Sequence, residues 1–127
     1  MTDSIVIDAS VVVDVLTGVH VADLPDGSWH APAHLDVEVV HALRGLVLGG
    51  HLTRPRAVDA LQDYTDLGVT IWPVDAVMRY RCFTLMDSLT AYDAAYVALA
   101  EGLDVPLITR DRRLAATASR LIDVVES

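Results

Sequence analysis

The sequence contains a single cysteine and no lysine, and each scarcity narrows what the chain can be. One cysteine, Cys82, cannot form a disulfide within the chain, so the fold has to be held by an apolar core. A chain of 127 residues is long enough to bury such a core without cross-links. We therefore expect residues 1–127 to form one domain.

Long hydrophobic runs are also absent, although 53% of the residues are apolar. The longest uninterrupted apolar stretches are a few residues, whereas a membrane-spanning helix needs about 20. The first residues, Met1–Ser4, lack the basic start and the longer apolar region of a secretory signal. These absences predict a soluble protein of the cytoplasm without a membrane partner.

Positive charge is scarce as well, since the formal net charge is -9. This balance argues against a nucleic-acid partner, because most of that affinity comes from neutralising phosphates. The objection weakens if some of the carboxylates hold a divalent cation, whose charge offsets theirs. The nine basic residues are all arginines and unevenly placed, and the ordinary interpretation of each group is solvated surface charge. They include the pairs Arg54 with Arg56 and Arg79 with Arg81, and the cluster Arg110, Arg112 and Arg113.

Short apolar runs alternate with helical patterns along the whole chain. Caps are expected at Ser10, Asp75 and Thr90, a helix end at Gly102, and a turn within the connection 18–27. The patterns predict strands at 5–7, 28–31, 69–72, 105–109 and 121–125, and helices at 11–16, 35–47, 55–67, 76–86, 91–101 and 114–119. Such alternation is typical of a mostly parallel α/β sheet covered by helices, with ligands at the carboxyl ends of the strands. Cys82, Trp29 and Trp72 are expected in the core.

Four acidic residues stand where this fold would gather them. Asp8 and Asp111 follow two predicted strands, and Asp93 and Glu38 lie early in two predicted helices. Each has an ordinary explanation as a helix cap, a first-turn acid or a solvated edge, and the spacing alone does not decide between these and a shared site. If the four converge, a cation is needed to hold them together, and oxygen ligands favour Mg²⁺ or Mn²⁺.

Four segments resemble, in order, the motifs of one protein family. The residues are Ile5–Val13, Glu38–Leu43, Tyr92–Ala100 and Pro106–Leu114. Together they are similar to PIN-domain proteins, and specifically to VapC, the toxin of prokaryotic VapBC toxin-antitoxin pairs. The segment 18–32 departs from the family's pattern, since it matches more loosely than these motifs do.

The resemblance implies a three-layer α/β/α PIN-like fold and a Mg²⁺- or Mn²⁺-dependent endoribonuclease, usually a homodimer. Asp8 and Asp93 match the family's metal ligands, and Glu38 and Asp111 match the acids that complete the catalytic site. Thr109 matches a residue that orients one of them, and Arg110 or Arg112 is a candidate to steady the phosphate of an RNA substrate. A cognate VapB-like antitoxin is implied too. We expect it to present an arginine to the carboxylates and a hydrophobic helix to the surface near the second and third helices.

Other classes of α/β protein that place a functional acid after the first strand fit the sequence less well. Haloacid-dehalogenase phosphatases need a second aspartate where Ser10 stands, receiver domains need a lysine, and no GxGxxG or GK[ST] motif for nucleotides is present. His34, Glu38 and His41 share a helical face that suits a transition metal, but no HExxH motif supports them. The remaining alternative is a PIN fold kept as a non-catalytic binding or scaffold module, against which the presence of all four acids argues.

Overall fold

Five parallel strands form the centre of the molecule. The structure, a computed structural model, describes residues 3–18 and 27–126. The strands of this part are β1 (Ser4–Ile7), β2 (Ser28–Pro32), β3 (Thr70–Trp72), β4 (Leu107–Thr109) and β5 (Val124–Glu126). They lie in the order β3-β2-β1-β4-β5, and every neighbouring pair is parallel. The predicted α/β class with a mostly parallel sheet is confirmed.

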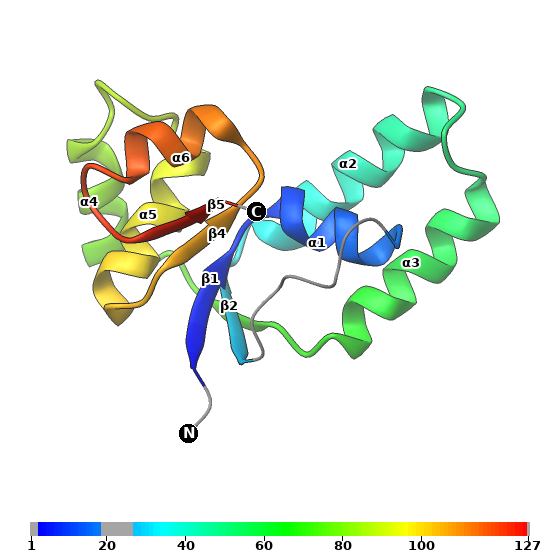
Figure 1. Cartoon of the computed structure of the whole chain (residues 1–127), viewed down its shortest axis with the longest axis horizontal. Helices are drawn as coiled ribbons and strands as arrows, with labels where there is room; N and C mark the ends of the chain where they lie inside the picture. Colours follow the sequence, from blue (N-terminus) through cyan, green and yellow to red (C-terminus); the bar gives the residue numbers. More distant parts are fainter. Residues whose placement is uncertain (1–2, 19–26, 127) are drawn as a thin grey trace.

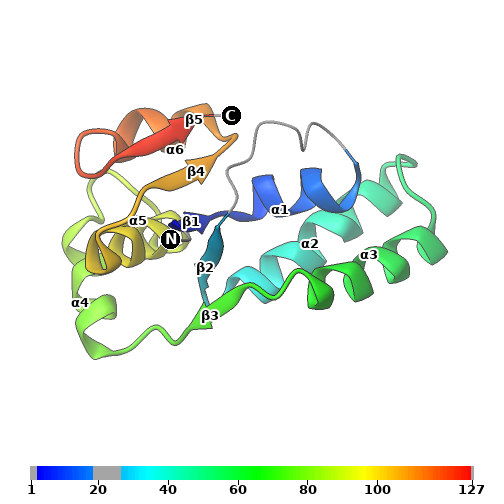
Figure 2. The ribbon, with the colours of Figure 1, turned by 60° about the horizontal axis from the view of Figure 1, so that its bottom comes forward.

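Helices cover the sheet and extend beyond it. They are α1 (Ala9–Leu16), α2 (Leu35–Leu48), α3 (Arg54–Asp66), α4 (Ala76–Thr84), α5 (Ala91–Leu103) and α6 (Arg112–Ala118). Figure 1 shows α1, α2 and α3 on one side of the strands and α4 and α5 on the other, which gives the three-layer α/β/α arrangement. In Figure 2, α2 and α3 run side by side and project beyond the sheet.

The strand order reverses direction between β1 and β4. The chain leaves β1 toward β2 on one side and leaves β4 toward β5 on the other, so the two connections diverge at the carboxyl ends of these strands. A crevice opens at such a switch point in parallel α/β sheets, and ligands bind there. Val6 and Ile7 pair with Leu107 and Ile108, so Asp8 and Thr109 follow at the same level.

The core lies between the central strands and α5. Ile5, Val6 and Ile7 are buried, as expected of a strand covered on both faces. All seven residues from 94 to 100 are buried too, and four of them are alanines. These small side chains let α5 pack closely on β1, β2 and β4. The close packing holds the first turn of α5 near the sheet.

Two predicted helix boundaries are wrong. Asp8, not Ser10, is the N-cap of α1, and its carboxylate accepts a hydrogen bond from the Val11 amide. Gly102 does not end α5, which continues to Leu103 and closes at Asp104 with a left-handed φ of 55°. Aspartate tolerates this conformation better than most residues, and the hydrophobic pattern gave no sign of it.

Several other predictions need correction at the ends of elements. The last strand begins at Val124, because the chain before it turns after α6, and α4 ends at Thr84 instead of Met86.

The prediction that Trp72 lies in the core is wrong. Trp72 is 37% exposed, and its indole N–H donates to Nδ1 of His30 at 2.9 Å. Cys82 is buried, as predicted.

The caps at Asp75 and Thr90 are confirmed, and the predicted turn within 18–27 falls largely on residues 19–26, outside the described residues. None of the helices in the described ranges has the length and apolar character needed to cross a membrane.

Candidate active site

Asp8 lies at the switch point, directly after β1, and its carboxylate is held on both oxygens. Ser10 Oγ donates to Oδ1 at 2.5 Å, and Thr109 Oγ1 donates to Oδ2 at the same distance. Only 6% of Asp8 is exposed. Its burial raises the pKa of the carboxyl above the usual range, although the hydrogen bonds from Ser10, Thr109 and Val11 partly oppose this. A buried carboxylate with fixed oxygens is suited to a cation.

The two hydroxyl groups that hold Asp8 are themselves fixed by the loop after β4. Ser10 Oγ accepts from the Arg110 amide at 3.0 Å, and Thr109 Oγ1 accepts from the Asp111 amide at 3.0 Å. The end of β1 is thereby tied to the end of β4 through side chains as well as through the sheet. Thr109 was expected to orient Glu38 or Asp111, but its hydroxyl donates to the carboxylate of Asp8 and accepts from the backbone amide of Asp111.

Asp93 occupies the first turn of α5. Its amide donates to Thr90 Oγ1, the N-cap of this helix, at 3.2 Å. Burial raises the pKa of the Asp93 carboxyl, and the negative charges of Asp111, Glu38 and Asp8 raise it further. Asp93 therefore lies within electrostatic range of the other three predicted acids, although the four come from different parts of the chain.

Glu38, in the first turn of α2, is held by two aromatic residues. Its Oε1 accepts from the hydroxyl of Tyr96 at 3.1 Å and lies 2.8 Å from Nε2 of His34. The ring of His34 packs edge-on against Tyr96, with centroids 4.9 Å apart. Burial raises the pKa of the Tyr96 hydroxyl, and the charge of Glu38 raises it further, so Tyr96 is a proton donor to Glu38 throughout the physiological range.

Asp111 is the N-cap of α6. Its Oδ1 accepts from the amides of Arg113 and Leu114 at 2.9 and 3.2 Å, and its side chain is exposed. Asp111 is thus a helix cap, as one of the two interpretations of the sequence allowed, and Asp8 is a helix cap as well. Capping turns each carboxylate back toward the amino end of its helix, and both of these helix starts follow central strands. A carboxylate in either position can therefore cap its helix and also face the site at the strand ends.

The arrangement of the acids fits a small divalent cation. Among the residues that the structure describes, no three acidic, histidine or cysteine side chains lie together as a ready-made ligand set. Mg²⁺ does not need one, because it keeps several waters and is held by one or two carboxylates. The donors are all oxygens, and their mutual repulsion at Asp93 is the cost that a cation would remove. Asp8 and Asp93 are therefore chemically suited to hold a divalent cation, as the resemblance predicts.

Three residues that support the acids were missed as such by sequence reasoning. The sequence patterns indicate Ser10 only as a helix cap, His34 only as a candidate transition-metal ligand, and Tyr96 only as part of a motif. The histidine metal site finds no support in the described residues, since His34 pairs with Glu38 and His41 is exposed. The spacing of four between His34 and Glu38 is the one local signal that could have shown their contact.

Several of the candidate arginines contact other groups of the protein. Arg110 Nε lies 2.6 Å from Asp14 Oδ2 on α1, and both side chains are largely buried. Arg81 makes a two-pronged contact with Glu101, at 2.8 and 3.0 Å, and Arg79 donates to the Val74 carbonyl at 2.7 Å. The role of Arg110 toward a phosphate stays a prediction.

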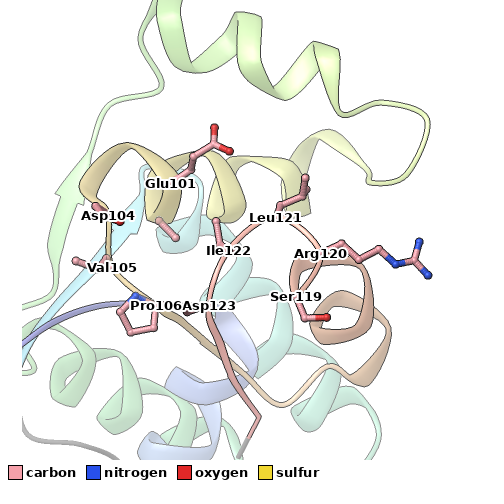
Figure 3. Close-up of a pocket in the computed structure, with 10 residues that line it drawn as sticks. Glu101, Asp104, Val105, Pro106, Ser119, Arg120, Leu121, Ile122 and Asp123 are labelled. Carbon is pink, nitrogen blue, oxygen red and sulfur yellow. The ribbon is translucent and has the colours of Figure 1, made fainter.

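A separate hollow lies at the opposite end of β4 and β5. It has a volume of 410 Å³ and is lined by residues of the α5–β4 and α6–β5 connections, including Asp104, Pro106 and Asp123 (Figure 3). Figure 3 shows the side chain of Arg120 extending away from it. Because these residues precede the strands, the hollow is remote from the carboxylates at the strand ends.

Comparison with known proteins agrees with this geometry. Residues 5–120 match the PIN domain family. The chain is 41% identical over 116 residues to Ribonuclease VapC12 of Mycobacterium tuberculosis, covering 87% of this chain and 89% of the relative. It is 40% identical over 120 residues to Ribonuclease VapC1 of the same species, covering 90% of each.

Solved structures support the same fold. PAE2754 from Pyrobaculum aerophilum superposes with a TM-score of 0.71 at 20% identity, covering 95% of this chain and 83% of that one. VapC20 of M. tuberculosis, described as a Sarcin-Ricin loop cleaving toxin, superposes with a TM-score of 0.64 at 15% identity, covering 88% and 93%. The chain described here belongs to the PIN-domain family, among the VapC ribonucleases.

Proposed function

We propose that the chain is the toxin of a type II toxin-antitoxin pair and hydrolyses RNA phosphodiester bonds with Mg²⁺ or Mn²⁺ as cofactor. The observation that carries the proposal is the gathering of carboxylates at the switch point of the sheet, where Thr109 of β4 holds Asp8, and where burial and then the charges of Asp111, Glu38 and Asp8 raise the pKa of Asp93. The names of the curated relatives support the reaction class. The metal dependence rests on the chemistry of the acids.

Asp8 and Asp93 are the proposed ligands of the cation, with Ser10 and Thr109 fixing the carboxylate of Asp8. When bound, a divalent cation polarises the scissile phosphate and lowers the pKa of a coordinated water. Glu38 and Asp111 complete the negative surface around that position, and one carboxylate accepts the proton of the attacking water. Tyr96 and His34 keep Glu38 from turning away, because both contact the same oxygen.

The test is RNA cleavage by the wild-type chain and by Asp93→Asn, with Mn²⁺ binding measured by calorimetry on both. We expect the variant to lose at least about 100-fold in cleavage rate, in the range of losing a group that stabilises the transition state. Asp63→Asn, on the exposed surface of α3, is the matched control and retains activity. A wild-type chain that binds no Mn²⁺ at millimolar concentration would favour the scaffold alternative.

The antitoxin has a suitable surface in the groove between α2 and α3. This groove has a volume of 480 Å³ and is lined mostly by apolar side chains: Val40, Leu43, Val47, Leu48, Ala57, Val58 and Leu61, with Arg44 and Arg54. An apolar groove between two helices accepts the apolar face of a third. We expect the antitoxin helix to occupy this groove, near the second and third helices, and to present an arginine to the carboxylates from there.

Val58→Glu tests the groove, since Val58 is 65% exposed and its replacement leaves the core intact. We expect the variant to lose co-purification with its antitoxin when both are expressed together, while it keeps cleaving RNA. Asp63→Glu on the same helix is the control. Retained co-purification of the Val58 variant would place the antitoxin elsewhere.

A further inference from the structure

Tyr92 is an exposed aromatic residue beside the carboxylates. It directly precedes Asp93 in the first turn of α5, and 66% of it is exposed. The rings of Tyr92 and His34 meet edge to face, with centroids 5.8 Å apart, and His34 in turn lies 2.8 Å from a carboxylate oxygen of Glu38. A flat ring is therefore held next to two of the four acids.

A hollow opens beside Tyr92, between α4 and α5. Its volume is 340 Å³, and the residues that line it include His34, Val74, Phe83, Met86, Tyr92 and Ala95. Phe83 and Met86 are exposed by 71% and 59%. Exposed apolar side chains that are gathered in one place mark a binding surface, whereas scattered ones do not.

We propose that this hollow, with Tyr92 as its stacking surface, receives an unpaired base of the RNA next to the phosphate that is cleaved. The inference rests on the proposed function and specifies its substrate further. Proteins recognise single-stranded RNA by placing splayed-out bases on aromatic rings. The substrate is therefore RNA in which the base beside the cleaved bond has left its stack.

The position of the hollow brings it within reach of such a base. A phosphate held by the carboxylates carries a nucleotide on either side, and each base is only a few bonds away from its phosphate. On the side of α1, the groups next to the acids are Asp14 and Arg110, which pair with each other at 2.6 Å. On the side of α5, they are the rings of Tyr92 and His34. Of these two surfaces, the second offers a base a flat aromatic contact.

The charge of the chain also favours binding through bases. Affinity for the phosphates of RNA comes from basic side chains, and this chain has a net charge of -9. Arg79, which also lines the hollow, donates to the Val74 carbonyl, and Arg81 pairs with Glu101. Stacking on an aromatic ring needs no positive charge, and every base has a face for it. Aromatic contacts can therefore supply affinity that phosphate contacts alone do not give an acidic protein.

An apolar segment of a protein partner is the competing occupant, because apolar hollows between helices also accept protein side chains. The α2–α3 groove is the larger of the two surfaces, at 480 Å³. Figure 2 shows α2 and α3 projecting beyond the sheet, whereas the hollow beside Tyr92 adjoins the acids. Its place next to the acids favours the substrate as its occupant.

The test compares single-stranded with double-stranded RNA. Asp93→Asn serves as the background, because it prevents cleavage and removes one charge that repels a phosphate. Fluorescence anisotropy measures binding of a short single-stranded RNA of mixed sequence and of the same RNA annealed to its complement. We expect Tyr92→Ala to weaken binding of the single strand about 10-fold. Binding of the duplex should not change, because its bases are stacked on one another and cannot reach the ring.

Two further substitutions separate stacking from apolar contact in general. Tyr92→Phe keeps the ring and should bind the single strand as the parent does, whereas Tyr92→Leu should bind it as weakly as the alanine variant. Tyr80→Ala, which removes a tyrosine that is 77% exposed on α4, is the matched control and should leave binding unchanged.

Cleavage gives a second readout, with Asp93 intact and Mn²⁺ present. Tyr92→Ala should raise KM about 10-fold and change kcat little, because a stacked base is bound equally in the ground state and in the transition state.

The proposal would be overturned by equal weakening of single strand and duplex, by a leucine variant that binds as phenylalanine does, or by an equal loss in the Tyr80 variant. A Tyr92→Ala chain that binds RNA normally but no longer co-purifies with the antitoxin would make the hollow a protein surface. If RNA binding depends on Tyr92 but the wild type cleaves no RNA, the base site stands and the proposed function fails. If the wild type cleaves RNA and Tyr92→Ala has the same KM, the function stands and the base site fails.

Discussion

Asp8 shows how one residue serves the fold and the site together. Its carboxylate caps α1, and the same carboxylate is held by Ser10 and Thr109 at the switch point. Capping and ligation do not compete, because the cap uses Oδ1, whereas Oδ2 accepts from Thr109 and has a second lone pair. An acid that looks ordinary in the sequence can therefore be catalytic, and spacing could not separate the two explanations. The resemblance to a family was needed to rank the acids.

Replacing Asp93 with Asn should stabilise the protein in the absence of metal. The pKa of Asp93 is raised in the folded protein, so its ionisation destabilises the fold. This destabilisation is absent at pH values below the usual pKa of an aspartate, about 4, and grows as pH rises through the folded value. We expect the variant to melt a few degrees above the wild type at pH 7.5 in EDTA and to match it near pH 3.5. Equal melting temperatures at pH 7.5 would contradict the claim that ionisation of Asp93 destabilises the fold.

Ser10→Ala should impair the site without unfolding it. The change removes the donor to Asp8 Oδ1 and the acceptor of the Arg110 amide, so the carboxylate loses one of the three hydrogen bonds that fix it and the other two hold it less tightly. Groups that orient a metal ligand typically contribute 10- to 100-fold to metal affinity or activity, and we expect a loss of about 10-fold in both. Mn²⁺ titration and RNA cleavage measure it.

Ser10→Thr keeps the hydroxyl and is the control for Ser10→Ala. If alanine binds Mn²⁺ as tightly as threonine does, Ser10 has no positioning role and serves only to join β1 to β4.

At the scale of elements, every strand and helix was predictable, but several of their ends were not. Apolar periodicity marks where an element can be buried, and α2 follows it closely, with Leu35, Val39 and Leu43 buried. Ends depend on backbone conformation and on contacts from distant parts of the chain. Helix α5 passes through Gly102 to Leu103, which packs against the core, and Asp104 then adopts the left-handed conformation that is usual for glycine.

Gly102→Ala tests this account of α5. Because Gly102 lies within the helix and an added Cβ would meet nothing within 4 Å, alanine should stabilise the fold by about 0.5 kcal/mol. Urea unfolding measures the difference. Gly68→Ala is the contrasting change, since Gly68 has a φ of +68° and alanine there should destabilise the fold. Destabilisation by both would mean that the helix ends at Gly102, as the sequence suggested.

At the scale of the whole molecule, the alternation of elements indicated a shared sheet edge for Asp8 and Asp111 but, apart from Thr109, not the side chains that hold the acids. A parallel sheet brings the exits of β1 and β4 to one edge, which follows from alternation of elements alone. The contacts of Tyr96 and His34 with Glu38, and of Ser10 with the loop after β4, depend on tertiary packing across as many as 100 positions of sequence. Local patterns contain no information on such pairs.

The excess of negative charge gives the last prediction, that a divalent cation stabilises the whole fold. Part of the charge of -9 is concentrated around Asp93, where it opposes folding, and a bound cation reverses that effect. A ligand at ten times its dissociation constant stabilises the folded state by about 1.4 kcal/mol. For a chain of this size we expect Mn²⁺ at such a concentration to raise the melting temperature by about 5 °C, and EDTA to cancel the rise.

The Asp93→Asn variant separates this binding from general screening of charge. It should melt above the wild type in EDTA, and Mn²⁺ should raise its melting temperature little. The difference in melting temperature between the two proteins should therefore shrink or change sign when metal is added. Asp63→Asn, which changes the net charge equally, should respond to Mn²⁺ as the wild type does. If all three proteins gained equally, the cation would be acting on the overall charge of the molecule, and the carboxylates at the switch point would not be its site.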